Sequence, residues 1–174
     1  MRKKVTPTDV ERVMREEDFI VSKTDLKGII TYCNRIFMEF ANYSEEELLG
    51  HNHNIIRHPD MPSVIFKILW GEIQAGKEVN AYVKNLASDG SYYWVFANIT
   101  PVYNGKNEIV GYSAVRRAPD REKLKNVIIP LYEKLLAEEK KHSKKSDGIQ
   151  ASYEMLNKIL EEKGMSYEEF ILTI

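Results

Sequence analysis

The sequence offers little material for covalent cross-links or membrane anchoring. It contains one cysteine, Cys33, in 174 residues, which excludes an internal disulfide framework and fits a reducing compartment. We interpret Cys33 as a small buried hydrophobic residue. No apolar run approaches the roughly 18 residues of a membrane helix, and the basic residues 2–4 are not followed by the apolar stretch of a signal peptide. We therefore expect a cytoplasmic protein with no membrane insertion of its own.

An excess of charge of either sign is also absent. The 25 Lys and Arg residues nearly balance the 26 Asp and Glu residues, for a formal net charge of −1, so nothing in the charge indicates a nucleic-acid partner. Glycine-rich phosphate-binding motifs, internal repeats and low-complexity tracts are missing as well. With 43% hydrophobic and 29% charged residues, the chain is long enough for one globular domain and additional elements.

What the sequence does contain is a dense polar stretch at residues 51–62. Three of the four histidines lie there with an arginine and an aspartate: His51, His53, Arg57, His58 and Asp60. The spacing of these histidines, without a distant ligand cluster, does not favour a metal centre. No arrangement of nucleophile, base and oxyanion hole is evident, so we do not expect an enzyme. Because apolar segments flank the stretch on both sides, we interpret it as the wall of a ligand pocket.

Hydrophobic periodicity and turn residues predict the order of secondary structure. The expected elements are a helix over 7–16, strands over 18–22 and 29–32, a helix capped by Asn34, a capping box at 44–47, a helix over 62–76, and strands over 79–86, 91–102 and 109–116. This order predicts an α+β fold in which helices cover one face of a five-stranded antiparallel sheet.

The character of the sequence changes in its last third. The expected features are a coiled-coil-like stripe at Leu124, Ile128, Leu131 and Leu135, an interruption at Pro130, a charged linker over 140–148, and helices over 149–164 and 166–174. We accordingly divide the chain into an N-terminal arm (1–17), a sensor domain (18–118) and a C-terminal helical extension (119–174).

One group of residues combines aromatic faces, amides and an arginine, a mixture that suits a planar, hydrogen-bonding cofactor. Its members are Asn34, Arg57, His58, Asp60, Trp70, Asn85 and Trp94. Most have a structural alternative, such as a helix N-cap for Asn34, an ion pair between Arg57 and Asp60, and core packing for the tryptophans. Asn85 is harder to explain in this way, because it follows two apolar residues on one face of its strand and would enter an apolar interior.

The chain resembles a PAS domain over residues 18–118, and more closely the PAS domain of the aerotaxis receptor (Aer) family. The resemblance rests on 54–62 (NIIRHPDMP), 83–85 (VKN), 92–95 (YYWV), 111–112 (GY) and the hairpin residues 89–90 (DG). It implies a PAS fold, non-covalent binding of FAD and redox sensing for energy taxis. The family's cofactor positions would be Asn34, Arg57, His58, Asp60, Trp70 and Asn85.

The resemblance also implies roles for particular side chains. Asn85 would bond the pyrimidine edge of the flavin and Trp70 would pack beside its ring system. Arg57 would meet the flavin or its phosphates, with Asp60 orienting it. His53 lies where LOV photoreceptors, another PAS branch, have their photoreactive cysteine, so light-driven adduct chemistry is disfavoured and His53 joins the candidate set.

Receptors of this family continue into a membrane anchor, a HAMP domain and a signalling rod, which we do not find in this sequence. The chain resembles instead a CetB-like stand-alone PAS protein, which implies a separate membrane-bound transducer of the methyl-accepting chemoreceptor type. The C-terminal helices would dock to this partner, form a homodimer, or simply cover the sheet.

Alternative functions remain open at this point. A haem-binding PAS gas sensor needs an axial ligand. His53 and His58 keep this alternative open, although the helix over 62–76 has no histidine. A cofactor-free PAS adaptor would only pair proteins through its helices. Whether a bound flavin is FAD or FMN is also left open.

Overall fold

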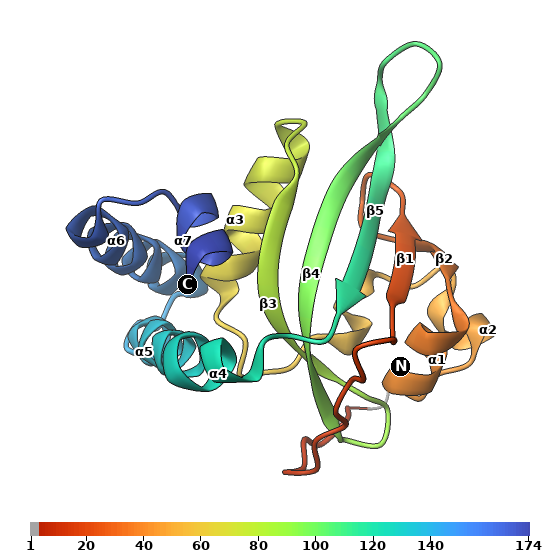
Figure 1. The fold of residues 1–174 in the computed structure, drawn as a ribbon, viewed down its shortest axis with the longest axis horizontal. Coiled ribbons are helices and arrows are strands. Elements are labelled where there is room, and N and C mark those ends of the chain that lie inside the picture. The colour runs from red at the N-terminus through yellow and green to blue at the C-terminus, as the bar shows by residue number, and fades with distance from the viewer. Residues whose placement is uncertain (1–3) are drawn as a thin grey trace.

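A five-stranded antiparallel sheet is the centre of the computed structural model, which describes residues 4–174 (Figure 1). The strands are β1 (Ile20–Thr24), β2 (Ile30–Cys33), β3 (Val79–Leu86), β4 (Tyr92–Tyr103) and β5 (Ile109–Arg117). Their order across the sheet is β2-β1-β5-β4-β3, with β2 and β3 at the edges. The predicted α+β class and the antiparallel five-stranded sheet are confirmed.

Alternation along the strands divides their side chains between two faces of the sheet. Across β3 and β4, Asn85 lies opposite Tyr93 on the inner face, and Lys84 lies opposite Trp94 on the outer face. The inner face is covered by α1 (Arg35–Ala41), α2 (Glu45–Leu48), the 3₁₀ helix η1 (His53–Ile56) and α3 (Ser63–Gln74). Phe40 of α1, for example, packs against Tyr93 with ring centroids 5.6 Å apart. The inner face therefore forms most of the core.

Capping residues fix the first helices where the sequence predicts them. The Asn34 side-chain oxygen accepts the Phe37 amide at 3.0 Å, which makes Asn34 the N-cap of α1. Ser44 and Glu47 form the predicted reciprocal capping box of α2. Cys33 is buried, in agreement with its interpretation as a small hydrophobic residue.

The N-terminal segment is extended, so the predicted helix over 7–16 is wrong. The Arg12 amide donates to the Tyr92 carbonyl at 2.8 Å, and the Tyr92 amide donates to the Val10 carbonyl at 2.9 Å. The Arg12 guanidinium also pairs with Asp89 at 2.8 Å. An isolated ten-residue helix is marginal in water, and backbone pairing with the start of β4 outweighs the local helix-start signal of Thr6 and Pro7.

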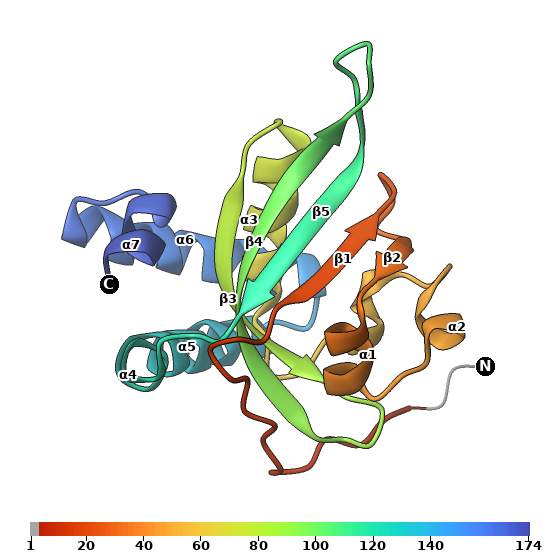
Figure 2. The same ribbon diagram turned by 45° about the vertical axis from the view of Figure 1, so that its right-hand side comes forward.

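Helices at the C-terminal end wrap around the β3 edge of the sheet (Figures 1 and 2). They are α4 (Arg121–Lys123), the π-helical turn η2 (Leu124–Ile128), α5 (Ile129–Lys140), α6 (Lys145–Lys163) and α7 (Tyr167–Thr173). The Tyr132 hydroxyl donates to the Tyr82 carbonyl at 2.6 Å, and the Tyr167 hydroxyl donates to the Asn80 carbonyl at 3.1 Å. These hydroxyls occupy edge-strand carbonyls that would otherwise be open to another strand. Of the roles considered for these helices, covering the sheet is the one that this chain displays.

Two local features shape the helical extension. Pro130 has no amide hydrogen to donate. The helix contains a π turn just before it, in which the Ile129 amide donates to the Leu124 carbonyl, five residues back. The linker is shorter than predicted, because α6 already begins at Lys145. Gly148 makes this start possible, since a Cβ there would come within 2.6 Å of the Glu139 carbonyl oxygen of α5.

Glu139 of α5 caps the N-terminus of α3, far away in the sequence. Its carboxylate accepts the amides of Ser63 and Val64, each at 2.9 Å. The hydroxyl of Ser152 in α6 donates to the same carboxylate at 3.0 Å. Pro62, which precedes α3, offers no side-chain cap of its own. One carboxylate therefore joins α3, α5 and α6.

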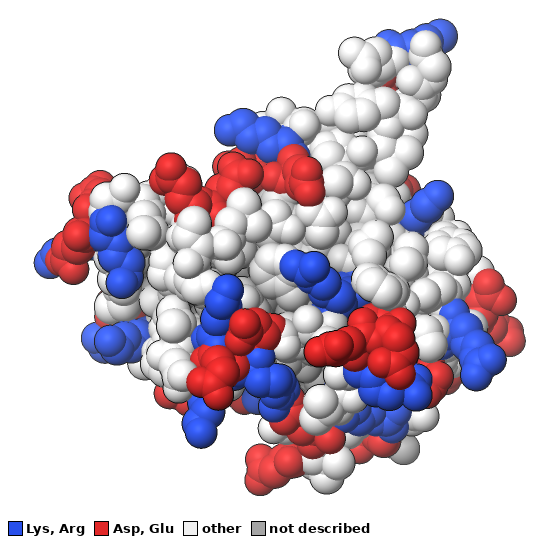
Figure 3. All heavy atoms as spheres, in the orientation of Figure 1, with Lys and Arg blue, Asp and Glu red and all other residues white. Residues whose placement is uncertain are grey.

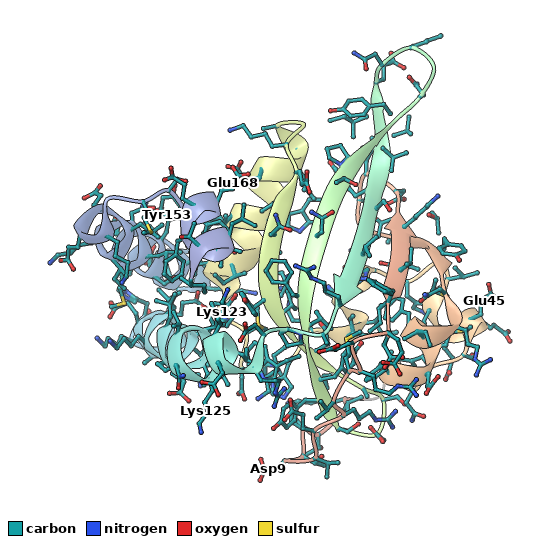
Figure 4. The ribbon with its side chains drawn as sticks, viewed as in Figure 1. Asp9, Glu45, Lys123, Lys125, Tyr153 and Glu168 are labelled. Carbon is teal, nitrogen blue, oxygen red and sulfur yellow. The ribbon has the colours of Figure 1, made fainter. Side chains whose placement is uncertain are left out.

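A second contact joins α6 to α3. The ammonium of Lys67 lies 4.7 Å from the ring centroid of Tyr153, which is labelled on α6 in Figure 4.

The surface of the protein has mixed charge, and Figure 3 shows acidic and basic side chains interspersed over the visible face. Within residues 4–174, no helix combines the length and the apolar character needed to cross a bilayer.

Replacement of Glu139 by alanine should lower the free energy of unfolding by about 1–2 kcal/mol, because the first amides of α3 lose their acceptor. Urea denaturation at neutral pH measures this difference. Glu133→Ala is the matched control, since Glu133 is exposed on the same helix, and it should change the value by less than about 0.5 kcal/mol. Equal effects of the two substitutions would contradict the role of Glu139 as a cap.

Candidate functional site

A cavity lies between the inner face of the sheet and the helices η1 and α3. Its apolar wall comes from α3 on one side and from β3 and β4 on the other: Leu69, Trp70, Ile73, Val83, Ala97 and Ile99. Its lining also includes polar side chains from β1, η1, the following loop, β3 and β5, among them Ser22, His53, Arg57, Asn85 and Arg116. Such a combination of apolar walls and a few convergent polar groups is typical of a small-molecule site.

The turn between β1 and β2 forms part of the cavity rim. Gly28 has a φ of +79°, and a Cβ there would lie 3.1 Å from the nearest ring atom of Trp70. Glycine therefore allows this turn to approach the indole closely. On its other side, Trp70 meets Tyr112 edge-on, with ring centroids 5.6 Å apart. These contacts fix the indole at the wall of the cavity.

Asn85 provides an open hydrogen-bond donor on the inner face of β3. The residue is only 4% exposed and lines the cavity, and its side-chain nitrogen has no hydrogen-bond partner among the described residues. A buried polar group without a partner costs about 1–3 kcal/mol. The conflict that the sequence indicates for Asn85 is thus present in the structure, because its amide points into a largely apolar space.

Arg57 lies on the cavity wall next to Asn85, to which its backbone forms an antiparallel bridge. Its guanidinium stacks 3.7 Å from the ring centroid of Phe66, and its Nε is buried without a partner. Burial lowers the pKa of Arg57. The expectation that Asp60 orients Arg57 is wrong, because the Asp60 carboxylate pairs with Lys84 at 2.9 Å instead. Asp60 does not line the cavity, and its side chain is largely exposed to solvent.

Four of the eight residues predicted for the cofactor site line the cavity and four do not. His53, Arg57, Trp70 and Asn85 come together there. Asn34 acts as a helix cap, and Asp60 is part of a surface ion pair. His58 is buried beside the cavity wall, where its Nδ1 accepts the Asp60 amide at 3.0 Å. Trp94 lies on the outer face of the sheet, 6.1 Å from the ring of Tyr132.

The predictions missed Ser22 and Arg116, which form a hydrogen-bonded cluster with His53. Arg116 donates to the Ser22 hydroxyl at 3.0 Å and lies 2.8 Å from His53 Nε2. Because a guanidinium can only donate, Nε2 must accept and His53 must be neutral. Burial and the charge of Arg116 lower the pKa of His53 to about 3. Alternation along β5 through Tyr112 and Ala114 was the signal that could have placed Arg116 on the inner face.

The sequence has relatives among known proteins. A family model described as the PAS fold matches residues 30–116, which is half of the chain. The aerotaxis receptor of Escherichia coli (strain K12) is 37% identical over 125 residues, which cover 71% of this chain and 24% of the receptor. The nitrogen fixation regulatory protein of Klebsiella pneumoniae is 30% identical over 105 residues, which cover 60% of this chain and 21% of that protein. The chain thus spans less than a quarter of the length of these relatives.

Solved structures show the same fold. A light-oxygen-voltage domain studied with a flavin analogue has a TM-score of 0.54 at 23% identity, covering 63% of this chain and 82% of that one. The dark structure of the Aureochrome1 LOV domain has a TM-score of 0.52 at 24% identity, covering 72% of this chain and 85% of that one. At this level of identity the likeness concerns the arrangement of the backbone.

Acid should destabilise the protein through its buried histidines. Burial lowers the pKa of His58 to about 4, whereas an unfolded histidine titrates near 6.5. Between these values the unfolded chain binds a proton that the folded chain does not, so stability falls as pH decreases from about 6.5 to about 4. The slope from one such histidine is at most about 1.4 kcal/mol per pH unit. Urea denaturation at several pH values in this window measures it.

His58→Asn should make this slope shallower, because an asparagine oxygen can still accept the Asp60 amide but does not titrate. The remaining slope would come from His53, whose pKa is lowered in the same direction, and near pH 4 also from carboxylates with a lowered pKa such as Asp89. His51→Asn is the control, since His51 is exposed, and it should leave the slope unchanged. A slope that His58→Asn does not alter would refute the assignment.

Proposed function

Since the chain belongs to the PAS family, we propose that its cavity binds a flavin non-covalently, that the flavin is FAD, and that the protein is a redox sensor for energy taxis. The observation that carries this proposal is the unpartnered amide of Asn85 in a largely apolar cavity. A flavin has two apolar faces and a hydrogen-bonding pyrimidine edge, which match the apolar walls and the open amide. The likeness to the E. coli aerotaxis receptor supports the same conclusion.

The residues of the cavity divide the work of holding such a ring. Trp70 and the aliphatic side chains around it would pack on the faces, and Asn85 would donate to an acceptor on the edge. Arg57 has a buried Nε that is open to an acceptor, which suits the ring or the phosphates. A bound flavin would supply reversible uptake of electrons and protons, and either change alters the hydrogen bonds that these side chains can make.

The haem alternative is disfavoured by the position of His53. Among residues 4–174, His53 is the one histidine that lines the cavity, and its Nε2 already accepts from Arg116. An axial bond to iron through this nitrogen would require Arg116 to withdraw. Adduct chemistry with a cysteine is disfavoured too, because Cys33 is buried and does not line the cavity. A cofactor-free adaptor would leave the cavity polar groups without a use.

A route from the cavity to a partner follows from the cap of α3. The wall that contains Arg57 continues through Pro62 into α3, whose first amides are held by Glu139. A change of the wall would shift this N-terminus and with it the helices α5 and α6. We propose that a membrane-bound transducer of the chemoreceptor type, with HAMP and methyl-accepting elements, reads this shift in the cytoplasm.

The purified protein should show the absorption bands of an oxidised flavin when it is produced with an adequate flavin supply, and dithionite should bleach them. Release by denaturation followed by chromatography then distinguishes FAD, which we expect, from FMN. A haem Soret band would support the gas sensor, and a colourless protein that takes up no added FAD would refute the proposal.

Asn85→Ala should weaken flavin binding about tenfold, since one hydrogen bond to the ring edge is worth about 1.4 kcal/mol. Trp70→Ala should also lower flavin retention, through loss of ring contact. Fluorescence titration with FAD measures the affinity, and circular dichroism verifies the fold. Asn98→Ala is the control, because Asn98 lies on the outer face of the neighbouring strand. Full retention in both cavity variants would exclude these residues from the site.

A further inference from the structure

Arg116 brings a buried positive charge to the cavity without a carboxylate beside it. The residue is 5% exposed, and its hydrogen bonds go to the Ser22 hydroxyl and to the neutral ring of His53. In the described part of the chain, no Asp or Glu forms a salt bridge with it. Burial lowers the pKa of Arg116 to about 10, so the guanidinium is still charged near neutral pH.

Such an arrangement is costly for a folded protein. A charge removed from water is normally paired with an opposite charge, and removal of one member of a buried pair destabilises by several kcal/mol. The ring of Phe37, 5.6 Å from the guanidinium carbon, contributes a partial attraction. Neutral groups such as this ring and the Ser22 hydroxyl orient the guanidinium without cancelling its charge. The inner end of the cavity therefore favours negative charge in whatever it holds.

The two neighbours of Arg116 act as positioning residues. His53 accepts a hydrogen bond from Nη2 of the guanidinium and Ser22 accepts one from Nη1, so the guanidinium is held from η1 and β1 at the same time. A histidine is suited to this position because burial and Arg116 keep it neutral. A lysine in place of Arg116 would keep the charge but not both directed bonds.

We propose that Arg116 is the counter-charge for the negative charge that arises in the cavity when the bound flavin is reduced, and that it thereby raises the reduction potential. This inference rests on the proposed flavin function. One electron from a one-electron donor, added without a proton, leaves one negative charge in the cavity. The guanidinium stabilises this charge, whereas the oxidised ring is neutral and gains less from it.

The test compares the reduction potential of bound FAD in three variants by spectroelectrochemical titration. Arg116→Gln keeps hydrogen-bond donors but removes the charge. The equilibrium constant for uptake of the first electron should fall at least tenfold, which corresponds to a potential lower by at least about 59 mV. Arg117→Gln removes the same charge from the next residue, which is exposed on the outer face, and it should change the equilibrium less than twofold. Arg116→Lys keeps the charge, so its equilibrium constant for uptake of the first electron should stay within about threefold of that of the unmodified protein.

Each further outcome has a definite meaning. Unchanged potential in Arg116→Gln with FAD retained, or an equal fall in Arg116→Lys, would overturn the counter-charge. If Arg116→Gln binds oxidised FAD poorly, the affinities for oxidised and for reduced FAD are measured instead, because their ratio determines the shift in potential. The affinity for reduced FAD must then fall at least tenfold more than the affinity for oxidised FAD. An unmodified protein that takes up no FAD overturns the proposed function as well, which separates the two failures.

Discussion

The inner face of the sheet cannot be closed by apolar packing alone, and the rest of the structure depends on this constraint. Asn85 on β3 and Arg116 on β5 both project from strands whose other inward residues are mostly apolar. If helices packed directly against this face, an amide and a guanidinium would be buried without partners in a low-dielectric interior. Instead η1 and α3 stand away from the strands at this point, and a cavity with a few polar groups results. The position of the ligand site thus follows from two side chains that the core cannot absorb.

The polar stretch after Gly50 combines two different tasks, which explains its unusual composition. His53 and Arg57 face the cavity, where one holds Arg116 and the other stacks on Phe66. His58 and Asp60 do not line the cavity. The His58 ring braces the loop by accepting the Asp60 amide, and the Asp60 carboxylate fastens the loop to β3 through Lys84. The histidine-rich stretch therefore divides into residues that line the cavity and residues that hold the loop in place.

Local signals in the sequence were sufficient for most of the sheet and for the starts of α1, α2, α3 and α7. Alternation predicted the strands, and Asn34 and Ser44 marked the starts of their helices because their capping bonds reach only three residues along the chain. The N-terminal helix failed because the competing interaction, pairing of Arg12 with β4, joins residues 80 apart in the chain. Trp94 could not be assigned to a face from the sequence, since aromatic residues occupy both faces at the start of β4. Arg116 was missed because an arginine at a strand end looks like an ordinary surface residue until the register is known.

The two tyrosine hydroxyls on the β3 edge have a consequence for how the chain can be divided. Tyr132 and Tyr167 satisfy main-chain carbonyls of the sheet, and the hydrophobic core runs without a break from Tyr93 through Leu135 to Phe170. A fragment that stopped after β5 would present bare acceptors along an apolar border, the geometry on which strands from separate molecules stack. Resistance to edge-to-edge association is therefore a property of the helices that follow β5 as much as of the sheet that they protect.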